Sequence, residues 1–310
     1  MNSPTSTPSI WRTVQFWRFV GQAIAVMCVI ALLSFLWINL TRNLQRLGLG
    51  LGFGFLRSQA GFTIGESLIP YQSSDTYGQA LLVGLVSSLS VIITGIGLAT
   101  VIGLIAGIAR LSNNWLVRHL ALVYVEVLRN TPLLLQLFFW YFAVFLSLPK
   151  PDNPVRWLGF SFSNSGIALP GGWRLTPEFS ALLLGLAIYT GTFIAEIVRG
   201  GIQSVPKGQW EAARSLGLKS DLTMRLVILP QALRAIIPPL GNQYLNLAKN
   251  SSLAIAVGFP DLYAVASTTF NQTGRAVEVM ILISVAYLTI SLTIALLLNL
   301  YNRRVQLVER

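Results

Sequence analysis

The chain of 310 residues is 54% hydrophobic and only 11% charged, whereas a typical soluble domain carries about 25% charged residues. Several apolar runs approach the ~20 residues that cross a bilayer, so the composition excludes an ordinary soluble protein and predicts an all-α polytopic membrane protein. The net charge of +11 is shared among separate short loops, which excludes the basic patch of a nucleic-acid-binding protein. A single histidine, His119, and a single cysteine, Cys28, leave no metal cluster, disulfide framework or catalytic residue to expect.

The N-terminal part is expected to contain one retained membrane helix. Residues 1–18 form a polar tail without a cleavage signal, and the apolar run Phe19–Leu40 is flanked by Arg18 and Arg42. A long apolar run with charged flanks is typical of a transmembrane helix rather than of a removed signal peptide. Residues 41–79 then form a segment on the opposite side of the membrane.

The rest of the chain is expected to form one membrane domain, residues 80–306, followed by a tail, residues 307–310. Hydropathy indicates five core helices in this domain. Their expected ranges are Leu81–Ala109, Leu133–Leu148, Phe179–Val198, Leu229–Leu247 with an irregular continuation to Val257, and Val279–Tyr301. His119 falls in the predicted loop before the second of these helices, and residues 149–178 and 258–278 form further outer loops.

The distribution of Lys and Arg predicts the orientation of the chain. Loops on the side of the N-terminus carry about twice as many basic residues as the loops on the other side, which predicts that both termini are cytoplasmic. Aromatic residues near the outer loops are candidates for an interfacial belt. They are Tyr71, Tyr77, Trp157 and Trp173.

Small residues predict a packing face on the first core helix. Gly103 and Gly107 have the GxxxG spacing that lets two helices approach closely in lipid. The partner is either another helix of the same subunit or a second subunit, and glycine is also simply common in membrane helices.

A charged stretch, Glu211–Pro230, lies between two late apolar blocks. Helical spacing predicts a short helix from Lys207, which Gly217 can end in a left-handed cap. Ser220 or Asp221 is expected to cap the next helix, and Pro230 is expected to bend the entry into the following span. The result is a helix–turn–helix elbow on the cytoplasmic face, either a docking surface for another protein or an ordinary amphipathic loop.

The elbow resembles the EAA loop of ABC-importer permeases. The matching residues are Glu211-Ala212-Ala213, Gly217 and the run from Val227 to Pro230, with Val227 in place of the usual Ile. In that family the loop seats in a cleft of the ATPase subunit and transmits its closure to the membrane helices. The resemblance therefore implies a set of coupling residues: Glu211, Ala212, Ala213, Gly217, Leu218, Leu229 and Pro230.

Longer stretches are similar to the polar amino-acid permease family. These are Tyr124–Phe142, Tyr189–Leu218, Leu229–Ala254 and Leu297–Val305, while Gly52–Tyr71 and Ala109–Pro132 resemble its general L-amino-acid branch. The resemblance implies a type I importer fold with five core helices plus an extra N-terminal helix, in a bacterial inner membrane. It implies as partners a cytoplasmic ATPase dimer, a second permease subunit that is a paralogue, a periplasmic amino-acid-binding protein and an amino-acid substrate.

The chain is not expected to be an enzyme itself. It contains no GxxxxGK[ST] phosphate-binding loop, and the glycine-rich run Gly48–Gly54 lacks the lysine. No cofactor is expected in this chain, and the resemblance implies that the partner ATPase binds ATP and Mg²⁺.

An amino acid is a zwitterion, so carrying it through a membrane requires partners for its ammonium and its carboxylate. Glu196 could accept the ammonium, or it could pair with Arg199 three residues on. Lys249, Asn250 and Ser251 follow Pro238-Pro239, and a broken helix there could line a cavity and bind the carboxylate.

Each of the remaining polar candidates has a structural alternative. Lys249 could instead extend to the membrane interface. Gln136 faces the path or bonds another helix. Arg129 is expected to anchor the cytoplasmic end of the third span or to pair with Glu126, and Thr131-Pro132 is expected to open that span.

The alternative function is an ion-gradient-driven secondary amino-acid transporter. It would need inverted repeats and buried acidic residues. Glu196 is almost the only acidic residue that the predicted spans offer for this role. An intramembrane enzyme would need a nucleophile–base pair or metal ligands at depth, for which the chain offers little.

Overall fold

The computed structural model describes residues 14–46, 50 and 52–305, in two units, Met1–Phe53 and Gly54–Arg310. The first unit consists of helix α1 (Val14–Arg46), whose apolar part, Phe16–Asn43, is long enough to cross a membrane. This confirms a helix in the range predicted for the first span. Most of the predicted N-terminal tail, residues 47–49 and 51, which include part of the glycine-rich run Gly48–Gly54, and the predicted C-terminal tail lie outside the described residues.

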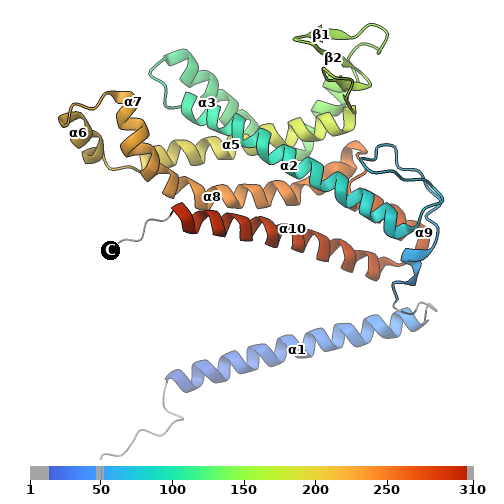
Figure 1. Cartoon of the computed structure of the whole chain (residues 1–310). Helices are drawn as coiled ribbons and strands as arrows, with labels where there is room; N and C mark the ends of the chain where they lie inside the picture. The colour runs from blue at the N-terminus through green and yellow to red at the C-terminus, as the bar shows by residue number, and fades with distance from the viewer. Residues whose placement is uncertain (1–13, 47–49, 51, 306–310) are drawn as a thin grey trace, which may run out of the picture. The chain divides into compact units, whose positions relative to one another are not determined.

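The second unit is a bundle of long helices that run side by side (Figure 1). Its long helices are α2 (Tyr77–Ala109), α3 (Trp115–Arg129), α5 (Pro177–Gln203), α8 (Leu229–Asn250), α9 (Leu262–Thr273) and α10 (Ala276–Val305). Its shorter elements are the 3-10 turn η2 (Gly54–Arg57), α4 (Leu133–Phe138), the π-helix η3 (Phe139–Phe145), α6 (Lys207–Ser215), α7 (Ser220–Thr223), the π-helix η4 (Met224–Ile228) and the 3-10 helix η5 (Ser251–Val257).

The described residues contain four helices long and apolar enough to cross a membrane, or up to six if each of two bent pairs is one span. The four are α1, α2, α5 and α10. The bent pairs are Trp115–Arg129 with Leu133–Phe145, and Ser220–Val257 with Leu262–Thr273. Six is the number that hydropathy predicts, and the first unit supplies one of them.

The third predicted span begins with helix α4 at Leu133, as expected, but a helix that the prediction lacks precedes it. Helix α3 begins at Trp115, where Asn114 accepts hydrogen bonds from two backbone N–H groups, so His119 is helical rather than in a loop. Helix α4 and η3 contain six and seven residues, which at 1.5 Å per residue reach about 20 Å and cannot cross a ~30 Å hydrocarbon layer alone. The two parts bend by 107°. Thr131-Pro132 lies at the break between the two helices, where Pro132 is the N-cap of α4.

The outer loop 149–178 is not irregular throughout, which corrects the all-α expectation locally. It contains a small antiparallel meander in the order β1 (Val155–Trp157), β2 (Phe160–Ser163), β3 (Gly166–Ala168) and β4 (Arg174–Leu175). The predicted outer loop 258–278 contains helix α9. Neither segment is apolar enough for a hydropathy scan to mark it as an element.

Helix α5 is the centre of the bundle, with 61% of its apolar window buried. Gly103 and Gly107 of α2 face it: a Cβ built on Gly103 would lie 2.5 Å from Ile194 Cβ, and one on Gly107 would lie 2.8 Å from the carbonyl oxygen of Ala195. The GxxxG face therefore packs within the subunit, against α5. This settles the choice that the sequence left open for these two residues.

The segment before α2 is packed onto the bundle. Phe55, Phe62 and Tyr71 pack against a cluster that contains buried Tyr77, so neither tyrosine lies free in an interfacial belt. The hydroxyl of Thr176 donates a hydrogen bond to Glu66, which links the segment to the start of α5. Burial raises the pKa of the Glu66 carboxyl, and the hydrogen bond from Thr176 opposes this shift.

Candidate functional site

The elbow has the helix and the cap that the sequence predicts. Helix α6 ends at Ser215, and Gly217 follows with φ +77°. The N–H of Gly217 bonds the carbonyl of Arg214 at 2.9 Å, and the N–H of Leu218 bonds that of Ala213 at 3.1 Å. These two bonds form a Schellman motif, in which a left-handed residue satisfies the last carbonyls of a helix.

The second half of the elbow differs from the prediction in its cap. Lys219 occupies the N-cap position of α7, and neither Ser220 nor Asp221 caps it, since both lie inside the helix. The chain then continues through η4 into α8 without a sharp corner, and Pro230 sits in the first turn of α8. Proline has no N–H and its ring crowds the preceding turn, which accounts for the wider π-helical turn in front of it.

The elbow is joined to the core on its inner side. Ala213 and Ile228 are buried, and Trp210, Met224 and Val227 pack against the core cluster of α5 and α8. A displacement of the elbow is therefore passed directly to two long helices, because packed interiors deform little.

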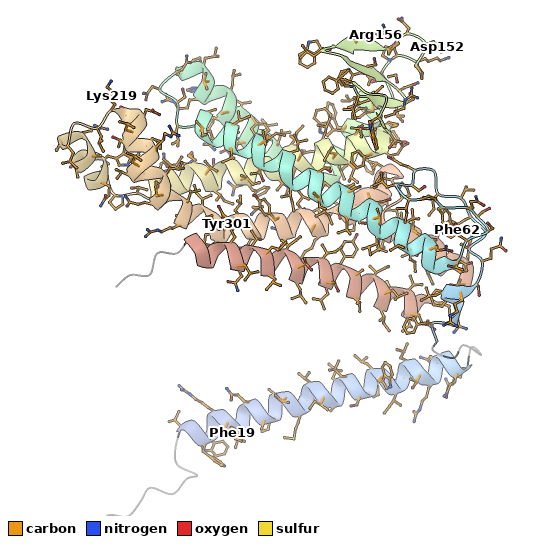
Figure 2. All side chains as sticks on the ribbon, in the orientation of Figure 1. Phe19, Phe62, Asp152, Arg156, Lys219 and Tyr301 are labelled. Carbon is orange, nitrogen blue, oxygen red and sulfur yellow. The ribbon has the colours of Figure 1, made fainter. Side chains whose placement is uncertain are left out.

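The outer side of the elbow is open. Of the predicted coupling residues, Glu211, Ala212, Gly217, Leu229 and Pro230 are exposed, Leu218 is half-buried and Ala213 is buried. Leu216, which the prediction did not include, is 81% exposed. The surface around Gly217 therefore combines an unpartnered leucine with charged side chains and is suited to docking. Figure 2 labels Lys219 at the far end of this projection from the bundle.

Glu196 is held by two arginines. Its Oε2 lies 2.9 Å from Nη2 of Arg199, and its Oε1 accepts a hydrogen bond from Arg110 at the end of α2. The predicted alternative, a pair with Arg199, is thus present. The carboxylate ties α2 to α5, and binding a substrate ammonium would require it to release at least one guanidinium.

Arg129 contacts an aromatic ring of another helix. Its guanidinium carbon is 5.3 Å from the ring centroid of Phe193, within the span α5. The geometry is that of a cation–π contact. Among the described residues Arg129 forms no ion pair with Glu126, so that alternative is not realised, and its role as an anchor at the membrane interface stays a prediction.

The break predicted at Lys249, Asn250 and Ser251 is present as a change of helix type. Helix α8 runs through both prolines to Asn250, and the 3-10 helix η5 begins at Ser251. Ser251 is buried and its hydroxyl bonds the carbonyl of Ala248 at 2.8 Å, whereas Lys249 is exposed. The change of helix type is therefore present at the predicted residues. The side chain of Lys249 is free to meet a ligand, whereas the hydroxyl of Ser251 is already bonded within the helix.

Gln136 performs a structural task. Its side-chain amide donates to the carbonyls of Leu128 at 2.7 Å and Thr131 at 3.0 Å, across the break between α3 and α4. Its Oε1 is buried without a hydrogen-bond partner. In the part of the chain that the structure describes, no hydrogen bond or ion pair links Gln136, Glu196 and Lys249, so these predicted path residues do not form one cluster.

A polar stripe on α8 was missed by the sequence analysis. Asn242, Asn246 and Lys249 are all exposed and follow one another at four and three residues, on one face of the helix. The helical spacing of these three residues can be read from the sequence, but the prediction for this stretch rested on its apolar residues. By contrast, the exposed side chains of α10 include Leu288, Leu292 and Leu296. The exposed side chains in this part of α8 are therefore polar, where those of α10 are apolar.

Asn242 also lines a cavity of about 250 Å³ between α8 and α10. Asn299 and Asn302 of α10 lie on the same cavity. Three amides at one opening extend the polar character of the stripe toward the end of the bundle that carries the elbow.

The chain is similar to known membrane transport proteins. The family described as "Binding-protein-dependent transport system inner membrane component" matches residues 99–307. The chain is 42% identical to the putative amino-acid ABC transporter permease protein YhdX of Escherichia coli K12, with 96% of each chain covered. It is 41% identical to the general L-amino acid transport system permease protein AapQ of Rhizobium johnstonii, with 92% of each covered.

Solved structures show the same fold. A chain of an amino acid ABC transporter crystallised with histidines superimposes with a TM-score of 0.60 at 33% identity, covering 74% of this chain and 95% of that one. A chain of the inward-facing MetNI methionine transporter gives a TM-score of 0.57 at 19% identity, covering 74% and 97%, and supports the fold alone.

Proposed function

Because the chain belongs to the family of binding-protein-dependent inner membrane components and is a permease subunit of an amino-acid ABC importer, we propose that its elbow couples it to the ATPase. The observation that carries this proposal is the elbow's two-sided construction. Its inner side packs on α5 and α8, and its outer side exposes Leu216 beside the left-handed Gly217. Such an element can receive a force and pass it to the bundle.

The family implies an ATPase and a binding protein as partners. In our proposal the ATPase is a dimer that binds ATP and Mg²⁺, and a paralogous second permease completes the path. This chain itself binds no cofactor and hydrolyses nothing. The elbow and both termini lie on the cytoplasmic side of a bacterial inner membrane, and the binding protein delivers an amino acid from the other side.

The substrate path is proposed to follow the polar stripe of α8. Asn242 and Asn246 offer hydrogen bonds to a zwitterion, and Lys249 offers a positive charge to its carboxylate. Asn250 lies at the change from α-helix to 3-10 helix, where backbone groups are free to bind a ligand. The similarity to general L-amino-acid permeases favours a broad range of amino acids.

The comparisons support an ATP-driven permease and give no support to an ion-gradient-driven transporter. The direct experiment is to purify the complete complex, reconstitute it in vesicles and measure uptake with ATP inside. Uptake that requires ATP and stops without the binding protein is expected. Uptake driven by a proton or sodium gradient in the absence of ATP would contradict the proposal.

Glu196→Gln separates the two roles proposed for Glu196. The amide leaves Arg110 and Arg199 without a counter-charge. We therefore expect the free energy of unfolding of the subunit to fall by ~2 kcal/mol, which lowers its melting temperature. The KM ratio between acidic and basic amino acids should then stay constant. Melting curves and uptake competition measure the two effects.

The control is the double variant Glu196→Gln with Arg110→Gln, which removes one charge of each sign. Recovery of stability in the double variant supports a tie between α2 and α5. A KM raised for all amino acids, with unchanged stability in the single variant, would show instead that Glu196 holds the substrate ammonium.

A further inference from the structure

The meander between η3 and α5 has two turns at the same end. In a meander of four strands the first and third turns lie together, and here they are the β1–β2 turn and the β3–β4 turn. A Cβ built on Gly159 in the first turn would lie 3.4 Å from Cγ of Pro170 in the third, so the turns touch. The two turns therefore present one continuous surface at the end of the sheet.

This end of the sheet is apolar and exposed. Trp157 is 66% exposed, and Leu158 and Trp173 are each 74% exposed. We call these three residues the tip. Leu158 has φ +49°, the one non-glycine residue with positive φ among the described residues, and this conformation is strained for a residue with a Cβ. The backbone thus holds a large apolar side chain outward at an energetic cost.

Basic residues flank the tip. Arg156 precedes Trp157 and Arg174 follows Trp173, each one position further from the end of the sheet. Figure 2 shows Arg156 at the edge of the sheet, away from the bundle. The segment Lys150–Leu175 contains three basic residues and one acidic residue, Asp152, so the surface attracts anions.

The chain holds the tip close to the membrane boundary. Strand β4 ends at Leu175, and the spanning helix α5 begins at Pro177. On its other side the sheet follows η3, whose Phe139 and Phe142 are exposed apolar residues. Trp173 is thus four residues from the first residue of α5, so the tip is within reach of the layer of lipid headgroups.

We propose that the tip inserts into the interfacial layer of the leaflet on the side opposite the elbow. Tryptophan is enriched at this level because its ring is apolar and its N–H is polar. Arg156 and Arg174 pair with the phosphates of anionic phospholipids, which attract basic residues close to the membrane surface. This lipid contact fixes the outer end of α5, the central helix, and does not depend on which solute the subunit carries.

The test places spin labels on the complete importer in phosphatidylethanolamine–phosphatidylglycerol nanodiscs. Cys28→Ser removes the native cysteine, and the label is attached at Leu158→Cys or, in a second protein, at Trp173→Cys. The matched control is Asn153→Cys, an exposed position at the other end of the same sheet. Frequent collisions of the spin label with oxygen indicate that it lies in lipid, and frequent collisions with a water-soluble nickel chelate indicate that it lies in water.

Both tip labels are expected about 5–10 Å below the boundary of the bilayer, and the control label in water. Arg156→Gln with Arg174→Gln should move the tip labels toward water, and so should replacing phosphatidylglycerol by phosphatidylcholine. Tip labels that collide with nickel as often as the control overturn the proposal. Labels protected only after the binding protein is added overturn it as well, because they identify the tip as a protein interface.

Discussion

A Gly217→Asp subunit is expected to insert into the membrane and fold, yet to lose ATP-driven uptake. Nothing lies within 4 Å of a Cβ built on Gly217, and aspartate tolerates a φ of +77° better than most residues. The folded subunit should therefore lose only ~1 kcal/mol. The added carboxylate, however, sits beside Leu216 on the surface proposed to dock.

Burying an unpaired carboxylate against the ATPase costs several kcal/mol. A cost of about 3 kcal/mol corresponds to a loss of about 100-fold in affinity for the ATPase. The measurements are recovery of the ATPase during purification of the labelled permease, and the initial rate of uptake in vesicles. Both should fall while the melting temperature of the permease changes little.

Two matched variants separate charge from backbone. Gly217→Asn has the same shape without the charge and should keep most of the activity. Gly65→Asp adds the same charge in the segment predicted to lie on the opposite side of the membrane, at a glycine that is likewise free of neighbours. This variant should leave uptake and recovery of the ATPase unchanged. Wild-type uptake by Gly217→Asp with the ATPase still bound would remove the elbow from the coupling mechanism.

The elbow was predictable because its determinants are local. Gly217 ends α6 for reasons contained in six residues of sequence, and the cap was confirmed. The predicted cap of α7 was wrong. Lys219, Ser220 and Asp221 are adjacent, and the sequence does not tell which of them leaves the helical conformation. Local chemistry thus identified the element and missed a boundary by one residue.

The bent span was not predictable in the same way. Arg118, His119 and Glu126 interrupt the apolar pattern of α3, so the stretch resembles a cytoplasmic loop. Its helix is stabilised by packing on α5, where Tyr124 donates a hydrogen bond to the carbonyl of Ile188 at 2.7 Å. Gln136 then closes the break to α4. Contacts between distant residues decided this part of the fold, and they leave no periodic signal.

The candidate site residues were also predictable where their contacts are local in sequence, and not where they depend on another helix. Charge pairing at i,i+3 predicts the contact of Glu196 with Arg199, but Arg110 comes from another helix. The stripe of Asn242, Asn246 and Lys249 was visible as a helical period, and only the fold shows that this face of α8 is exposed. Sequence identifies the polar groups, and the packing of the helices decides which of them face a path.

Gly103→Ala is expected to destabilise the subunit although alanine is the better helix former. A Cβ on Gly103 would lie 2.5 Å from Cβ and Cγ2 of Ile194 and 3.0 Å from the carbonyl oxygen of Gly191. Ile194 is fully buried and the other contact is backbone, so the helices α2 and α5 must separate. Overpacking of this kind costs ~1–3 kcal/mol.

Gly97→Ala is the matched control on the same helix. No atom lies within 4 Å of its Cβ position, so this variant gains up to ~1 kcal/mol of helix propensity without a clash. The two substitutions are chemically identical and should shift the melting temperature of the purified permease in opposite directions. Equal melting temperatures would contradict the packing described for α2 and α5.

The same experiment separates the two partners that a GxxxG face can have. Separating α2 from α5 strains the contact between Arg110 and Glu196, which joins the ends of these helices. Gly103→Ala should therefore destabilise the isolated subunit and reduce uptake together. A variant that melts normally alone and fails only to assemble with a second permease would place Gly103 at an interface between subunits, where its contact with Ile194 would have no role.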